Sequence, residues 1–156
     1  MKLSTLNPRK IALVALVAAT LPLAGIASAN GSTSTWGCSV DPERPVFDHI
    51  NPANGNKVIR YDMTVNCAAG RTVEIEQHIH EQDGGLNKDD HITSNVRDRH
   101  FSTASTVTMW WENTLPDTEL GQEEMYQTVK FRVIMDDLSS SPWTSFEDSP
   151  VQAFSN

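Results

Sequence analysis

The stretch Lys57–Cys67 reads Lys-Val-Ile-Arg-Tyr-Asp-Met-Thr-Val-Asn-Cys and decides the class of fold. Every second residue from Ile59 to Cys67 is apolar, and the residues between them are polar. Successive side chains of a β-strand point to opposite faces, so this period of two predicts a strand with one buried face and one wet face.

The same alternation recurs along the rest of the chain. Val73, Ile75 and Ile79 alternate with polar residues, and Gln77 is the exception in the inward-facing set. Further strands are predicted at 36–40, 46–47, 91–101, 105–111, 125–135 and 151–154. The segment 91–101 is weakly patterned, as an edge strand is. About seven short strands with turn signals between them predict an all-β fold, a small antiparallel β-sandwich of the immunoglobulin-like class.

One part of the chain adds a resemblance to a known family. Tyr126-Gln-Thr-Val-Lys-Phe-Arg-Val-Ile, followed by Ser141-Pro-Trp-Thr-Ser-Phe-Glu-Asp-Ser-Pro-Val, resembles the last two strands of fibronectin type III domains. The resemblance implies the fold class and no functional residue, because a fold does not imply a function. The two cysteines depart from the antibody pattern, since they bracket the first two strands.

The N-terminus has the features of a bacterial-type secretory signal. Basic residues at positions 2, 9 and 10 precede an apolar run from Ile11 to about Leu23, and Ala27-Ser28-Ala29 supplies the small residues of a cleavage site. The apolar run is shorter than the roughly 20 residues that a membrane span needs. We therefore expect residues 1–29 to be removed and the protein to be secreted, with a loose leader at 30–35 and one domain at 36–156.

The charge of the chain excludes some partners. The chain has 12 Lys and Arg against 20 Asp and Glu, and three of the basic residues lie in the predicted signal, so the mature charge is 9 − 20 = −11. Such a surface disfavours nucleic acid and anionic membrane as partners. The charge mainly keeps a secreted protein soluble.

Cys38 and Cys67 are the two cysteines of the chain. In an oxidising compartment an even number of cysteines predicts a disulfide, and two allow a single pairing. Closing a loop of this length stabilises the fold by roughly 3–4 kcal/mol on the chain-entropy model.

His78-Ile79-His80 is the strongest candidate for a metal site. Residues i and i+2 of a strand share a face, so both imidazoles can converge on one zinc or copper ion, which takes three or four ligands. The residues that could approach this pair are Glu76, Gln82, Asp83, His91 and His100. The sequence does not assign the third ligand, and the alternative is a pair of solvated histidines on a wet strand.

Trp110 and Trp111 are adjacent in a predicted strand, so they face opposite sides. If Trp111 fills the core, Trp110 lies outside, where an indole can stack on a sugar or anchor a protein partner. Trp36 and Trp143 lie near predicted strand ends and are expected to be structural. The acidic loop at 83–90 lacks the spacing of a calcium loop.

Catalytic motifs are absent from the sequence. It contains no Gly-x-Ser-x-Gly and no His-Glu-x-x-His, and a disulfide removes the thiols as nucleophiles. Glu74 and Glu76 line a wet strand face, and Glu123 and Glu124 are interpreted as a charged turn. By elimination the sequence favours a secreted, non-enzymatic recognition domain without a cofactor, whose partner is an extracellular protein or a cell-envelope component. The alternatives are sugar binding through Trp110 and metal binding through His78 and His80.

Overall fold

The computed structural model describes residues 33–83, 89–116 and 121–155. The predicted signal peptide, residues 30–32 of the leader and residues 84–88 of the acidic loop lie outside these ranges. The strands are β1 (Thr33–Thr35), β2 (Cys38–Pro42), β3 (Val46–Ile50), β4 (Lys57–Cys67), β5 (Arg71–Glu81), β6 (Asp90–Phe101), β7 (Ser105–Thr114), β8 (Gln122–Met135), β9 (Glu147–Asp148) and β10 (Gln152–Ser155). In the part of the chain that is described, no helix is long and apolar enough to cross a membrane.

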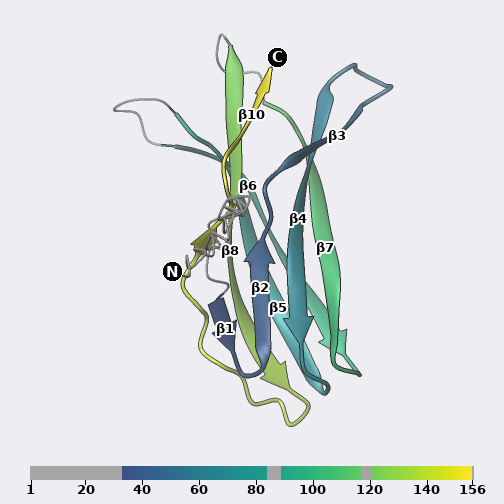
Figure 1. The fold of residues 1–156 in the computed structure, drawn as a ribbon, viewed down its shortest axis with the longest axis vertical. Helices are drawn as coiled ribbons and strands as arrows, with labels where there is room; N and C mark the ends of the chain where they lie inside the picture. Colours follow the sequence, from purple (N-terminus) through teal and green to yellow (C-terminus); the bar gives the residue numbers. More distant parts are fainter. Residues whose placement is uncertain (1–32, 84–88, 117–120, 156) are drawn as a thin grey trace, which may run out of the picture.

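Two antiparallel sheets face each other, with their strands running along the long axis of the molecule (Figure 1). Sheet A has the order β1-β2-β4-β3, and β7 also pairs with β4. Sheet B has the order β10-β8-β5-β6, and β9 also pairs with β8. The predicted all-β sandwich is confirmed, and β4 has the bounds of the stretch from which the sequence argument began.

The ten strands of the described residues exceed the predicted set by β1 and β9, and two edge strands of the sandwich are interrupted. β2 pairs with residues 63–67 of β4 and β3 with residues 57–60, so the two lie in succession on the same edge of β4. Pro42 and Pro45 lie at this break, where a residue without a backbone N–H cannot continue the ladder. β9 and β10 share an edge of β8 in the same way.

β1 and the two-residue β9 are the strands that the sequence did not suggest. Thr33–Thr35 falls in the segment expected to be a loose leader, yet it pairs antiparallel with β2 through Thr33↔Val40 and Thr35↔Cys38. The stretch has only small polar residues and therefore no apolar alternation to reveal it.

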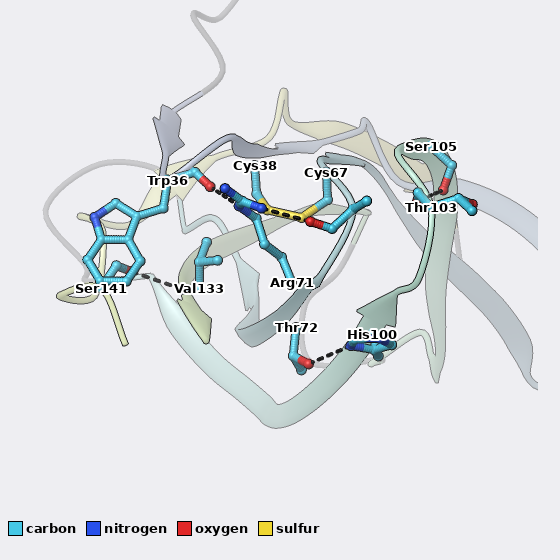
Figure 2. Close-up of a disulfide and its surroundings, with 11 residues drawn as sticks. Trp36, Cys38, Cys67, Arg71, Thr72, His100, Thr103, Ser105, Val133 and Ser141 are labelled. Carbon is cyan, nitrogen blue, oxygen red and sulfur yellow. Dashed lines mark hydrogen bonds between the residues drawn. A yellow bond between two sulfur atoms is a disulfide. The ribbon is translucent and has the colours of Figure 1, made fainter. Parts of the chain in front are cut away.

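The core lies between the inner faces of the sheets in two clusters. The larger surrounds the disulfide and includes Val65, Val73 and Phe131, and the smaller includes Ile59 and Tyr61. Cys38 and Cys67 form the predicted disulfide, are directly opposite each other in β2 and β4, and are 2% and 1% exposed (Figure 2). The bond therefore links two neighbouring strands of sheet A.

A chain of buried amides connects the two sheets. Gln127 Nε2 in β8 donates to the carbonyl oxygens of Asp62 (2.6 Å) and Glu43 (2.8 Å), which lie at the break between β2 and β3. Gln77 Nε2 donates to Gln127 Oε1 (2.5 Å), and Asn95 Nδ2 donates to Gln77 Oε1 (3.1 Å). Gln77 is inward-facing and polar because it belongs to this series of amides, which ends on the carbonyl oxygen of Glu43 and on that of Asp62, the latter also accepting from the backbone N–H of Glu43 at 2.9 Å.

Candidate functional site

His78 and His80 lie on the outer face of sheet B, as the alternation along β5 predicts. The inward-facing residues of β5 are buried, whereas the two histidines between them are partly exposed. His80 pairs directly with His91 of the neighbouring strand β6, just past a register shift between Ile79 and His80. His91 is thereby brought to the same face as the His78–His80 pair.

Three imidazoles surround one point on this face. The ring centroids of His78 and His91 are 5.2 Å apart, those of His80 and His91 are 5.4 Å apart, and those of His78 and His80 are 6.1 Å apart. His91 is therefore the third residue that the sequence could not assign. His100, another candidate from the sequence, lies at the far end of β6, where its Nδ1 is 3.1 Å from Thr72 Oγ1.

The surrounding side chains hold two of the rings in place. Glu76 Oε1 lies 2.8 Å from His78 Nε2, while Glu76 Oε2 accepts from Lys130 Nζ at 2.9 Å. The bond to Lys130, and then the contact with His78, lower the pKa of Glu76, so its carboxylate remains ionised. Tyr126 stacks on the ring of His80 with centroids 5.0 Å apart.

Burial, and then the charges of His91 and His78, lower the pKa of His80, while Asp89 and Asp148 act in the opposite direction. The ring is thus favoured in its neutral form, which is the form that binds a metal. Tyr126 Oη donates to Asp89 Oδ2 at 2.7 Å, and burial together with this bond raises the pKa of Tyr126. The phenol therefore stays protonated and acts as a support for His80.

The separation of the rings is close to that of a metal site. An imidazole nitrogen lies about 2.0–2.1 Å from zinc, which puts ring centroids about 3 Å from the ion and about 5 Å from one another in a tetrahedral set. His78 Nε2 lies 2.8 Å from Glu76 Oε1, so a His78 ring that keeps this contact offers Nδ1 to an ion, while His80, whose Nε2 lies 3.4 Å from Thr128 Oγ1, and His91 must turn about their side-chain bonds to share the ion. Such rotamer changes leave the strands in place.

A second group of possible ligands lies on sheet A. Among the described residues, Asp48, His49 and Glu112 are the group whose ligand atoms already lie within 4.8 Å of one another. Arg60 Nη1 is 3.3 Å from Asp48 Oδ1, and Arg60 Nε is 3.0 Å from Asp62 Oδ1. A guanidinium thus already neutralises this group, which makes it a weaker cation site than the histidines.

Trp110 lies on the outer face of sheet A and is 51% exposed, as predicted. Trp111 faces the other side, is partly buried, and has the guanidinium of Arg97 5.6 Å from its ring centroid. Asp62 lies directly opposite Trp110 on β4. Asp62, which pairs with Arg60 at 3.0 Å, therefore lies beside this indole, and Thr108 and Glu112 share its face of β7.

The sequence placed two pairs of glutamates at the surface. The structure agrees with this position for Glu74 and contradicts it for Glu123. Glu74 is held by Arg132 at 2.7 Å on the wet face of sheet B, as expected for a solvated strand. Glu123, which the sequence places in a charged turn with Glu124, instead lies in β8 and is 0% exposed. The error arises because β8 begins at Gln122, so Glu123 occupies an inward-facing position of the strand two residues before Met125.

No family model, curated protein or solved structure matches this chain. The candidate function therefore rests on the chemistry of the chain itself.

Proposed function

We propose that this chain is a metal-binding domain that holds one divalent transition metal ion through His78, His80 and His91. The observation that supports the proposal is the gathering of three imidazoles from two adjacent strands, with centroids 5.2, 5.4 and 6.1 Å apart. Strands place side chains more rigidly than loops do, so the cost of ordering these ligands is small.

The donor set favours zinc, copper or nickel over calcium or magnesium. Imidazole nitrogen suits the transition metals, whereas calcium and magnesium prefer oxygen ligands. The Glu76 carboxylate contacts Nε2 of His78. A carboxylate that contacts the nitrogen not bound to the metal commonly orients a metal-binding histidine. Three protein ligands leave a fourth position for water or for a ligand from outside, on the solvent side of the sheet.

Secretion is part of the proposal. The disulfide is compatible with an oxidising compartment, and the features of residues 1–29 support export with cleavage after Ala29. An ion bound outside the cytoplasm would make this a secreted metal-binding protein.

Titration of the exported, oxidised chain with Zn²⁺, Cu²⁺ and Ni²⁺ after chelator treatment tests the proposal. Calorimetry should show one ion per chain, and the bound ion should raise the melting temperature. His91→Ala should weaken binding by more than about 100-fold, beyond the loss typical of residues that only orient a ligand. His100→Ala is the matched control, since it removes another histidine of the same strand, and it should leave the affinity unchanged.

Two outcomes would overturn the proposal. One is the absence of binding tighter than about 1 mM for all three ions, which is less than 5 kcal/mol of binding free energy. The other is an ion whose affinity falls in Asp48→Asn and is unaffected in His91→Ala, which would place the site on sheet A.

Recognition of an extracellular protein or cell-envelope component is a second proposal, and the exposed indole of Trp110 is the observation that favours it. An exposed aromatic beside a charged pair is typical of an anchor in a protein interface. Chemical crosslinking to envelope proteins, compared between the native chain and Trp110→Thr, tests it. A partner that both chains retain equally would contradict a role for Trp110.

We also propose a fibronectin type III-like, immunoglobulin-class topology. Counting β2 with β3 as the first strand and β9 with β10 as the last, sheet A contains strands one, two and five. Sheet B then has the order seven, six, three, four. This division supports the resemblance of the last two strands, because immunoglobulin-like sandwiches place their last two strands beside the third in one sheet.

A further inference from the structure

The turn between β1 and β2 has a tryptophan, Trp36, at a position where the backbone has a positive φ. Thr35 pairs with Cys38, so Trp36 and Gly37 alone form the loop, with φ of 46° and 75°. Positive φ at both positions is the pattern of a type I′ hairpin turn, which favours Asn, Asp or Gly at the first position. A bulky side chain there is strained, because its Cβ approaches the backbone.

The surroundings hold this strained turn in place. Arg71 Nε donates to the carbonyl oxygen of Trp36 at 2.6 Å, and Arg71 Nη1 donates to that of Ala69 at 2.7 Å. Figure 2 shows the side chain of Arg71 beside the disulfide, with the indole of Trp36 directed away from both. Trp36 remains 43% exposed, so burial of the indole only partly offsets the strain. Strained residues that the fold supports in this way are often found at binding sites.

A hollow of about 290 Å³ adjoins the indole. Its lining consists of Ser34, Thr35, Trp36, Gly37, Cys38, Ser39 and Asn66. The volume is near the lower end of small-ligand pockets, about 300 Å³. No residue of this lining is charged, although the chain as a whole has a net charge of −8.

We propose that this hollow binds a neutral sugar ring of an extracellular glycan. The apolar face of a pyranose can stack on the Trp36 indole, and the hydroxyls and amide of Ser34, Ser39 and Asn66 can exchange hydrogen bonds with its hydroxyl groups. A charged ligand has no counter-ion in this lining. A purely apolar ligand would offer no hydrogen bond to the Ser34 and Ser39 hydroxyls or to Asn66 Oδ1, while Asn66 Nδ2 already donates to Thr106 Oγ1 at 2.8 Å. The proposal is independent of the metal site, which lies on the outer face of sheet B.

The contrast with Trp110 explains why the sugar site is assigned to Trp36. Both indoles are exposed, but Asp62, directly opposite Trp110, is ion-paired with Arg60 and brings charge to that face, whereas the lining of the hollow beside Trp36 has no charged residue. The sequence offered sugar binding through Trp110 as an alternative and predicted a structural role for Trp36. The hollow and its uncharged lining favour the opposite assignment.

Trp36→Asn is the informative variant, because it removes the stacking surface and supplies a residue that the turn prefers. Binding of the exported chain to glucose, galactose, N-acetylglucosamine and their β-linked oligomers is measured by saturation-transfer NMR and calorimetry. The native chain should bind at least one of these sugars, and Trp36→Asn should lower that affinity at least tenfold. The melting temperature of Trp36→Asn should be equal to or above that of the native chain, which separates lost binding from lost folding.

Phe47→Thr is the matched control, since it removes an exposed aromatic ring from the same sheet, and it should retain the affinity. The proposal is overturned if no sugar of the panel binds at about 10 mM. It is also overturned if Trp36→Asn binds as well as the native chain, or if Phe47→Thr or Trp110→Thr is the variant that loses binding.

Discussion

Sheet A and sheet B are both antiparallel, but different interactions stabilise them and different polar groups lie on their outer faces. Sheet A contains both cysteines, and its outer face pairs Arg60 with Asp48 and Asp62. Sheet B has no covalent link, and its inner face contributes Gln77 and Gln127 to the buried amide chain. On its outer face three imidazoles gather. Polar groups inside the sandwich are used for folding, whereas those outside retain the capacity to bind a ligand.

Removal of the disulfide should give the largest loss of stability and should leave the histidine face intact. The bond closes a separation of 29 residues, so the double variant Cys38→Ala, Cys67→Ala should lower the free energy of unfolding by about 3–4 kcal/mol. Urea denaturation of the native and double-variant chains measures this difference. The metal affinity of the double variant is measured at urea concentrations at which it is still folded. If that affinity also fell, the assignment of distinct roles to the two sheets would be wrong.

Gln127→Leu should give the next largest effect, because it breaks the amide chain inside the sandwich. The change leaves the carbonyl oxygens of Asp62 and Glu43 and the amide of Gln77 without this partner, which should cost about 2 kcal/mol. Gln152→Leu is the control, since within the described part of the chain Gln152 Nε2 donates to the carbonyl oxygen of its neighbour Ala153, and it should change stability by less than about 0.5 kcal/mol. Equal melting temperatures for the two variants would contradict a role for the amide chain.

Glu76→Gln tests the outer face of sheet B without removing a ligand. Loss of the carboxylate beside His78 should lower the metal affinity by about 10- to 100-fold, since such partners orient the ring and raise its basicity. Glu74→Gln is the control on the same strand and face, where the carboxylate pairs with Arg132, and it should leave the affinity unchanged. Equal losses in both variants would indicate a general effect of charge on the ion.

The sequence predicts local features of this molecule well and features that depend on register poorly. Alternation alone gives the bounds of β4, the shared face of His78 and His80, and the outward position of Trp110, because these depend on the period of a single strand. His91 reaches the cluster through a register shift between β5 and β6, which no pattern within one strand contains.

The buried polar residues are the second feature that the sequence predicts poorly. Gln77 is visible as an exception to the alternation, but its partner Gln127 bonds to carbonyls at the break between β2 and β3. Glu123 was placed in a turn because acidic residues are seldom buried, and the start of β8 decided its position instead. The first case depends on a contact between sheets and the second on the residue at which a strand begins, and local composition specifies neither.

Asp41→Asn should give the smallest effect and tests the surface of sheet A. Burial, and then the charges of Glu43 and Glu147, raise the pKa of Asp41 above its ordinary value of 3.8. The folded state therefore binds the proton more tightly than the unfolded state. The resulting stability is present below pH 3.8 and is lost as the pH rises through the folded-state pKa.

At pH 7 the charged Asp41 opposes folding, so Asp41→Asn should raise the melting temperature by roughly one or two degrees, and the gain should vanish near pH 3. Asp137→Asn is the control with the opposite sign, because hydrogen bonds from Ser139 lower the pKa of Asp137. Its charged form favours folding above pH 3.8, so the variant should gain nothing at pH 7. A gain for Asp41→Asn that persists at pH 3 would show that charge repulsion is not its cause, and the acidity of sheet A would then have no measurable cost for folding.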